Sequence, residues 1–255
     1  MNVLLVDVGN STVDFRVWNK KTNIMTKIFR PETHEKEFKS SSRLKRKILS
    51  KNIGFDEIIY CSVVPEWNDI IRALGQSVGV KVYNFRNELV INNSDFNLEG
   101  VENIGADILA NFSAVKLKHK LDNVAVISMG TATTIFVVQN KKFQGVSISP
   151  GLETSIDGLI SKASLLKNFV YAKTNVDIGK TTNDAINLGA CNGHFFMIKG
   201  LIEYFKTKFT IDKVIITGGI ANIFEDDIFE LNYTLNEQLI FEGIIEVYKQ
   251  IKKEG

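Results

Sequence analysis

The sequence predicts an α/β protein in which one mixed-sheet unit occurs twice. Residues 3–19 (VLLVDVGNSTVDFRVWN) recur in altered form at residues 124–140 (VAVISMGTATTIFVVQN), with Val, Gly, Thr, Phe, Val and Asn at matching places. Each copy reads as an apolar strand, a tight glycine turn edged with hydroxyl or amide groups, and a second strand. A similar order of strands and helices follows each copy, and 44% hydrophobic residues supply ample core material. Together these observations indicate a duplicated fold.

The first half has the pattern of a mixed sheet flanked by helices. Apolar periodicity predicts the following elements: strands at about residues 3–8, 12–18 and 24–30, a charged helix at about 40–51, a β-rich run at 57–64, a helix at about 67–77 opened by Pro65, and a strand at 80–85. Residues 86–102 have no clear period, so we expect a surface excursion there.

The second half repeats this scheme. A helix at about residues 103–118, apolar on one face, connects the halves. The elements expected after it are strands at about 123–128, 133–139 and 142–148, a helix after Pro150-Gly151, a long helical stretch at about 181–208, a strand at 213–216 and a terminal amphipathic helix at about 235–253. We therefore expect two subdomains, residues 1–117 and 118–255.

Composition narrows the class of function. The formal net charge is only +2 and the Lys and Arg residues are dispersed, which argues against a nucleic-acid partner. Cys61 and Cys191 lie in unrelated apolar surroundings, so neither a metal cluster nor a disulfide framework is expected. The chain enters a strand at Val3 without a leader pattern, and no apolar run approaches the roughly 18 residues of a membrane span. We expect a cytoplasmic protein with no membrane partner.

Three glycine turns carry the chemistry. In residues 7–12 (DVGNST), Asp7 can hold a hydrated Mg²⁺ ion and Gly9 lets the backbone pass close to phosphate oxygens. Residues 128–134 (SMGTATT) offer hydroxyls and amides, and residues 217–222 (TGGIAN) form a glycine turn between a strand and a helix. Each alone also suits an ordinary turn. Their order predicts a split phosphate site without a Walker motif, as in a phosphotransferase or ATPase.

At these residues the chain resembles the type III pantothenate kinases, members of the actin-like ATPase and sugar and acetate kinase superfamily. The matching motifs occur in the family's order and span nearly the whole chain: DVGNST at 7–12, GAD at 105–107, GTATT at 130–134, SPGL at 149–152, GKTT at 179–182 and TGGIAN at 217–222. The resemblance implies a duplicated ribonuclease H-like (actin-like ATPase) fold, with a cleft between two mixed-sheet subdomains. It further implies ATP- and Mg²⁺-dependent phosphorylation of pantothenate to 4'-phosphopantothenate, the first step of coenzyme A biosynthesis.

The resemblance also implies site residues. Asp107 would be the catalytic base that takes the hydroxyl proton, although it could alternatively cap or solvate the helix at 103–118. The ATP contacts would come from Asp7, Val8, Gly9, Asn10, Ser11, Thr12, Val13, Gly130, Thr131, Gly218 and Gly219, with Asp7 holding Mg²⁺ through water. The pantothenate pocket would contain Gly105, Ala106, Asp107, Ile108 and Thr182. Thr182 alternatively belongs to the cap of the long helix.

The family also implies a homodimer through the long helix at 181–208, whose apolar residues would equally suit a core. The chain departs from the family's pattern at several positions. Val146 replaces a Gly, and Val101 lies about where a Pro is usual. Ile108 replaces an Arg, and Ser128 replaces an Asp associated with a monovalent cation, K⁺ or NH₄⁺. A hydroxyl cannot supply that charge, so we expect weakened or lost potassium dependence. Two alternatives stay open: a catalytically weak or silent homologue acting as a nucleotide-binding regulator, and a kinase of another small alcohol.

Overall fold

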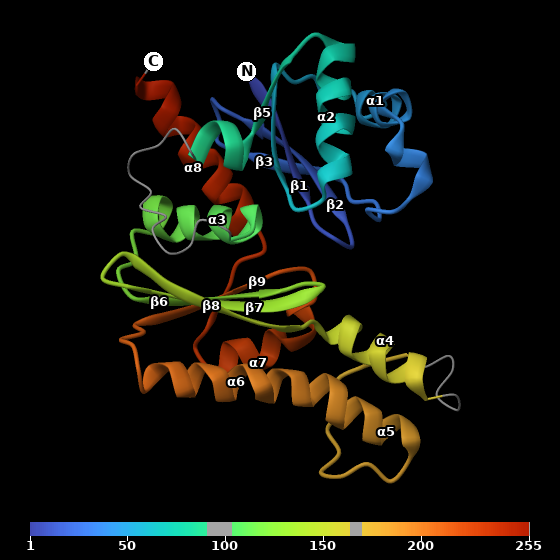
Figure 1. Ribbon diagram of the computed structural model, residues 1–255, viewed down its shortest axis with the longest axis vertical. Coiled ribbons are helices and arrows are strands. Elements are labelled where there is room, and N and C mark those ends of the chain that lie inside the picture. The colour runs from blue at the N-terminus through green and yellow to red at the C-terminus, as the bar shows by residue number, and fades with distance from the viewer. Residues whose placement is uncertain (91–103, 164–169, 255) are drawn as a thin grey trace. The chain divides into compact units, whose positions relative to one another are not determined.

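The computed structural model describes residues 1–90, 104–163 and 170–254, and the chain divides into two compact units. Unit 1 contains the residues up to Lys120 together with the terminal helix from Leu239, and unit 2 runs from Leu121 to Gln238. Each unit is built on one five-stranded mixed sheet (Figure 1). None of the helices in the described ranges combines the length and the apolar character needed to cross a membrane.

The sheet of unit 1 has the order β3-β2-β1-β4-β5. Its strands are β1 (Asn2–Val8), β2 (Val13–Asn19), β3 (Met25–Phe29), β4 (Glu57–Ser62) and β5 (Lys81–Asn84). The first three strands pair antiparallel, while β4 and β5 run parallel to β1. The helical elements are η1 (Lys36–Lys39), α1 (Ser41–Leu49), α2 (Pro65–Val78), η2 (Phe85–Val90), α3 (Ala106–Ser113), η3 (Ala114–Lys118) and α8 (Leu239–Glu254).

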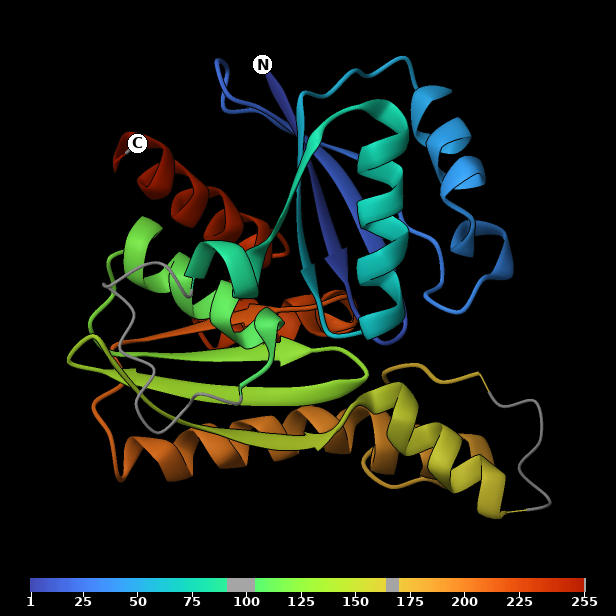
Figure 2. The same ribbon diagram turned by 45° about the horizontal axis from the view of Figure 1, so that its top comes forward.

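Alternation along the strands separates the two faces of this sheet. Leu4, Val6 and Val8 of β1 enter a core with α1 and α2, the two helices that Figure 2 shows side by side on one face. The odd-numbered positions of β1, which include Asp7, therefore lie on the opposite face, where α3 and α8 pack. The first strand thus places the carboxylate of Asp7 on the face that α3 covers.

Helices α3 and α8 approach closely at one glycine. A Cβ atom on Gly243 of α8 would overlap the carbonyl oxygen of Ala110 in α3. Only a residue without a side chain allows the two backbones to come this near. The terminal helix therefore holds α3 in place on unit 1.

Unit 2 repeats the arrangement, with the order β8-β7-β6-β9-β10. Its strands are β6 (Val124–Met129), β7 (Ala132–Gln139), β8 (Lys142–Pro150), β9 (Lys213–Thr217) and β10 (Thr234–Leu235). Again the first three pair antiparallel, and the last two run parallel to the first. The helical elements are α4 (Leu152–Lys162), α5 (Thr182–Ile186), η4 (Asn187–Asn192), α6 (Gly193–Lys206), η5 (Ala221–Phe224) and α7 (Glu225–Glu230).

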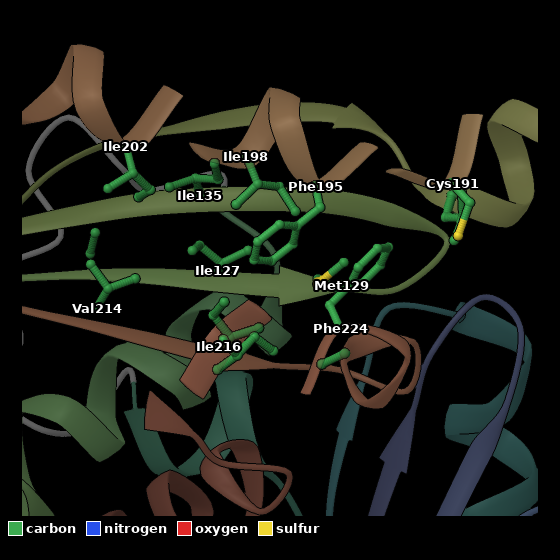
Figure 3. Packing of buried hydrophobic residues seen from close by; sticks show 14 of the residues in the cluster. Ile127, Met129, Ile135, Cys191, Phe195, Ile198, Ile202, Val214, Ile216 and Phe224 are labelled. Carbon is green, nitrogen blue, oxygen red and sulfur yellow. The ribbon is translucent and has the colours of Figure 1, made fainter. Parts of the chain in front are cut away.

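The core of unit 2 lies between one face of its sheet and α6 (Figure 3). Ile127 and Met129 of β6 meet Ile198 of α6 there, and the ring of Phe195 stacks on that of Phe224 with centroids 5.1 Å apart. Met129 immediately precedes Gly130, so this packing fixes the strand end from which the second glycine turn starts.

The predicted duplication is confirmed, because the two sheets share one strand order and the repeated segments form the hairpins β1–β2 and β6–β7. Several elements differ from the prediction. Residues 85–90 form the π-helix η2 where an excursion was expected, and residues 91–103 lie outside the described part of the chain. Residues 36–39 form a 3₁₀ helix that the sequence did not predict, whereas residues 221–230 form the helical elements η5 and α7 after the predicted glycine turn. The short strand β10 stands at 234–235, and the terminal helix begins at Leu239 instead of about residue 235. Finally, α8 packs with unit 1, although the predicted division grouped it with the second half.

Candidate functional site

Three carboxylates gather on the α3 face of the unit 1 sheet. Asp7 is the next-to-last residue of β1, and its antiparallel register partner is Asp14 of β2. Residues directly opposite each other in an antiparallel pair point to the same face. Asp107 belongs to the first turn of α3, which packs on that face. The structure thus brings Asp7 and Asp107 near each other and adds Asp14, a residue that sequence reasoning missed.

The pKa of Asp7 reflects this crowding. Burial, followed by the charges of Asp107 and Asp14, raises the pKa of Asp7 to about 7, against the opposing effect of Arg30 and Arg16. A divalent cation would relieve the repulsion between these carboxylates, so the donor set fits a magnesium ion. In the described ranges no group of three or more His, Cys, Asp or Glu side chains could hold a metal by itself. Magnesium at Asp7 would therefore need further oxygen ligands from water and phosphate.

Asp107 folds back over the start of α3. A Cβ atom on Gly105, the residue that precedes the helix, would overlap Oδ1 of Asp107. Burial raises the pKa of Asp107, while hydrogen bonds from the backbone N–H groups of Ile108 and Asp107 itself oppose the rise. A raised pKa suits a general base, because the proton must be accepted near neutral pH. Ala106 and Ile108, on either side, are buried.

The backbone segment that contains Thr33 is hydrogen-bonded to the first glycine turn. The turn closes through a hydrogen bond from Gly9 N–H to the Thr12 carbonyl oxygen, 3.0 Å long. Thr33 then binds it twice: its N–H donates to the Ser11 carbonyl at 2.8 Å, and its Oγ1 donates to the Gly9 carbonyl at 2.6 Å. The Trp67 indole N–H in turn donates to the Thr33 carbonyl at 3.1 Å. Thr33 therefore positions the turn.

Arg30 lies at the edge of this turn and is hydrogen-bonded to it. Its Nε donates to Oγ1 of Thr12 at 2.9 Å, and the next residue in the chain, Pro31, accepts a backbone hydrogen bond from Val13 at 2.9 Å. Neither Arg30 nor Thr33 lies in a glycine motif, and residues 30–33 follow the turn by about twenty positions. The only signal in the sequence is a polar residue at each end of a short break after a strand, which is common in loops.

The other two glycine turns meet within unit 2. Gly218 has a φ of 104°, and a Cβ atom there would overlap the backbone of Met129. The Ile220 N–H donates to the Met129 carbonyl at 3.3 Å. Because Met129 leads directly into Gly130 and Thr131, the TGG turn lies against the second glycine turn, with Gly218 at the contact and Gly219 following it. Only glycine suits this close approach.

Gly151 holds the same turn from another side. Its N–H donates to the Thr131 carbonyl at 2.9 Å, and a Cβ atom on Gly151 would overlap the carbonyl oxygen of Gly130. Thr154 in α4 donates its hydroxyl to the Thr131 carbonyl at 2.6 Å. The Pro150-Gly151 motif thus fixes the shape of the second turn.

Ser128 belongs to a row of hydroxyl groups. Its register partners are Thr134 on β7 and Thr217 on β9, so three neutral oxygens share one face of the unit 2 sheet. A different hydroxyl, that of Thr133, lies 2.9 Å from Nε2 of His194. Burial lowers the pKa of His194, which keeps this histidine neutral in a structural role.

Thr182 does not cap its helix. The N-cap of α5 is Thr181, whose Oγ1 accepts a hydrogen bond from the Asp184 N–H at 3.1 Å. Thr182 is exposed at the first helical position. Figure 1 shows α5 next to α4, at one end of unit 2. The capping residue is therefore Thr181, and the alternative interpretation of Thr182 as a cap is wrong.

Comparison with known proteins agrees with these features. The model of the type III pantothenate kinase family matches residues 3–204. A type III pantothenate kinase from Pelagibacter ubique is 29% identical over 256 aligned residues, which cover 98% of this chain and 100% of that protein.

Two solved structures support the fold alone. A conserved Baf family protein from Campylobacter jejuni superposes with a TM-score of 0.60 at 17% identity, covering 98% of this chain and 99% of the other. An archaeal actin homologue superposes with a TM-score of 0.50 at 11% identity, covering 100% of both chains. The predicted duplicated ribonuclease H-like fold is confirmed, and the chain belongs to the type III pantothenate kinase family.

Proposed function

We propose that this protein phosphorylates pantothenate with ATP to give 4'-phosphopantothenate, the first step of coenzyme A biosynthesis. The observation that carries the proposal is the pair of carboxylates Asp7 and Asp107, on one face of unit 1 and electrostatically coupled. A kinase of this family needs one carboxylate for the acceptor hydroxyl and one for the metal that accompanies the phosphates. Asp107 and Asp7 fit these two roles respectively.

Asp107 is the base in this proposal. It accepts the proton of the primary hydroxyl of pantothenate while the hydroxyl oxygen forms a bond to the γ-phosphorus. The bond between that phosphorus and the β–γ bridging oxygen breaks, and ADP leaves. The raised pKa of Asp107, caused by burial, makes its carboxylate a better proton acceptor than an exposed one. Gly105 leaves room for the carboxylate, and Ala106, Ile108 and Thr182 belong to the proposed pantothenate pocket.

ATP and Mg²⁺ are the proposed cofactors. The turn from Asp7 to Val13 supplies backbone N–H groups to phosphates, and Asp7 holds the ion through water, which neutralises charge on the transferred group. In unit 2, the joined turns of Gly130-Thr131 and Gly218-Gly219 offer a second set of N–H groups. We propose that both sets of N–H groups bind phosphate oxygens of ATP.

The monovalent cation is a separate matter. Ser128, Thr134 and Thr217 supply neutral oxygens, and a cation site without a carboxylate binds K⁺ or NH₄⁺ weakly. We therefore propose that turnover has little or no potassium dependence.

We also propose a homodimer that uses the outer side of α6. Phe195, Ile198 and Ile202 belong to the core of unit 2, whereas Phe196 and Tyr204 are each 57% exposed on the same helix. Exposed aromatic side chains of this kind are typical of subunit contacts. Both cysteines are free and buried, which fits the reducing cytoplasm that we propose as the compartment.

A coupled assay of ADP release with pantothenate, ATP and Mg²⁺ tests the activity. We expect turnover by the unaltered protein and a loss of at least about 100-fold in kcat for Asp107→Asn. Asp157→Asn, an exposed carboxylate on α4, is the matched control and should keep full activity. Turnover no higher than that of Asp107→Asn would leave a silent nucleotide-binding homologue. ADP release with other small alcohols but not with pantothenate would indicate a different acceptor.

A further inference from the structure

We propose that Arg30 is a phosphate-binding residue, whose guanidinium contacts the triphosphate of the nucleotide at the edge of the first glycine turn. This inference rests on the proposed ATP site. Arg30 is not part of any glycine motif, and the phosphate contacts considered so far are made by the backbone of the turn itself.

The position of Arg30 is fixed from two directions. Its Nε donates to the hydroxyl of Thr12 at 2.9 Å. Its backbone is held as well, because the Val13 N–H donates to the carbonyl of Pro31 at 2.9 Å and Thr12 forms a β-bridge with Glu32. The side chain and the main chain thus both keep the guanidinium beside the turn.

The outer donors of Arg30 remain available. The residue is exposed, and over the described ranges no carboxylate lies within ion-pair distance of its guanidinium. With Nε bound to Thr12, the two Nη groups can donate as a fork. Two parallel N–H donors match two oxygens of a phosphate group, and this geometry is a common reason for arginine in phosphate sites.

The neighbouring arginine does not have this freedom. Arg16 forms an ion pair with Asp14 at 2.9 Å, and its guanidinium lies 4.4 Å from the centre of the Phe241 ring. It is committed to the interior of unit 1, where it partly offsets the charge of Asp14. Arg30 also acts on Asp7 electrostatically, which places its charge near the carboxylate proposed to hold magnesium. A triphosphate brings several negative charges to this acidic face, and Arg30 supplies a positive one at its rim.

Calorimetric titration with three probes tests the assignment: ATP with Mg²⁺, adenosine, and inorganic tripolyphosphate with Mg²⁺. The variants are Arg30→Ala and Arg30→Lys, with Arg43→Ala as the control because Arg43 is an exposed arginine of unit 1 on α1. We expect Arg30→Ala to weaken the binding of ATP and of tripolyphosphate about 10- to 100-fold, the usual effect of losing a charge-assisted hydrogen bond. The binding of adenosine should stay unchanged. The affinities of Arg30→Lys should lie between those of Arg30→Ala and the unaltered protein. Arg43→Ala should bind all three probes as the unaltered protein does.

Steady-state kinetics add a second measurement. We expect Arg30→Ala to raise KM for ATP and to leave KM for pantothenate within about twofold, since phosphate contacts are lost and acceptor contacts are kept. Thermal unfolding followed by circular dichroism establishes that each variant is folded.

Two results would overturn the assignment. In the first, Arg30→Ala binds ATP and tripolyphosphate as tightly as Arg43→Ala does. In the second, Arg30→Ala lowers the affinity for adenosine as much as the affinity for ATP, which would indicate a structural role. The proposed function fails by itself if the unaltered protein binds ATP yet does not phosphorylate pantothenate. In that case the titrations still decide the role of Arg30. If the unaltered protein binds neither ATP nor tripolyphosphate, both proposals fail.

Discussion

Asp7 has a carboxyl group where the unliganded fold would be more stable with a neutral side chain. Burial and two neighbouring carboxylates raise its pKa to about 7, so at higher pH the protein holds a charge that its surroundings oppose. Polar groups that reduce stability in this way are typical of binding and catalytic sites. The cost follows from placing several carboxylates where a metal and a triphosphate are proposed to bind.

This cost should be measurable in Asp7→Asn. The folded pKa is raised above the unfolded value of about 4, so between these values the folded state binds more protons and stability falls as pH rises. Without nucleotide, we expect Asp7→Asn to increase the free energy of unfolding at pH 8 by on the order of 1–3 kcal/mol. The gain should vanish near pH 4.

Denaturant unfolding at a series of pH values between 4 and 8 measures this effect. Asp69→Asn, an exposed carboxylate of unit 1 on α2, is the control and should show no such dependence. A gain in the Asp7 variant that is independent of pH would contradict the explanation.

The absent side chain of Gly105 matters for a different reason. A Cβ atom there would displace the carboxylate of Asp107, so Gly105→Ala should lower kcat by about 10- to 100-fold, because the proposed base is moved from its place. Gly54→Ala is the matched control, since nothing lies within 4 Å of a Cβ atom there. We expect thermal unfolding of Gly105→Ala to stay close to that of the control. Equal kcat values for the two variants would mean that the orientation of Asp107 does not matter.

Asp7 and Asp107 could be proposed from the sequence because each stands in a short motif beside a glycine. Thr33, Arg30 and Asp14 could not. Thr33 reaches the turn only after β3 has brought the chain back, and Asp14 becomes a neighbour of Asp7 only through strand register. Contacts of this kind depend on pairing between segments, which a single sequence does not state.

At the scale of elements, the segment from Arg30 to Thr33 serves as a support for the first turn. Thr33 is 1% exposed and makes its hydrogen bond to Gly9 through a hydroxyl. Thr33→Val keeps the shape and removes that bond, leaving a carbonyl oxygen with one fewer partner. We expect a loss of about 1–2 kcal/mol in the free energy of unfolding and a higher KM for ATP.

Thr26→Val on β3, where the side chain is exposed, is the control for this substitution. The comparison uses denaturant unfolding and initial rates at varied ATP concentration. Stability lost without any change in KM would show that the support does not influence nucleotide binding.

The contact between α3 and α8 is the second feature at this scale. Gly243→Ala would press a methyl group into the Ala110 carbonyl, so we expect a loss of about 1–3 kcal/mol in stability. A fall in kcat should accompany it, because α3 carries Asp107. At Gly200 on α6 a Cβ atom would meet nothing within 4 Å. Gly200→Ala should therefore keep kcat and should not lose stability, because alanine favours a helix over glycine. Periodicity predicted the terminal helix, but it could not say which surface the apolar face would cover.

At the scale of the whole molecule, the repeat of 17 residues was enough to predict two related units. Both sheets have the same strand order, so the duplicated hairpin indicated the fold as well as the turns. The division between the units was less accessible to sequence reasoning. It depends on the packing of α8, and a helix at the end of a chain can return to any surface that matches it.

The row of hydroxyls at Ser128 leads to a prediction about the intact enzyme. We expect replacement of K⁺ by Na⁺ to change kcat by less than about twofold, since Ser128 and its register partners Thr134 and Thr217 offer neutral oxygens. Ser128→Asp should make the rate depend on K⁺ or NH₄⁺. Initial rates across a series of chloride salts at constant ionic strength provide the measurement. Strong potassium dependence in the unaltered protein would contradict the prediction.

The return of the last helix to unit 1 has a consequence for synthesis on the ribosome. Unit 2 is a continuous segment that can complete its core as soon as it has emerged. Unit 1 has to wait for α8, because α8 is synthesised after the whole of unit 2. The first-made half of this protein would therefore be the last to mature, and a nascent chain cut short before Leu239 should contain one finished globule and one open sheet.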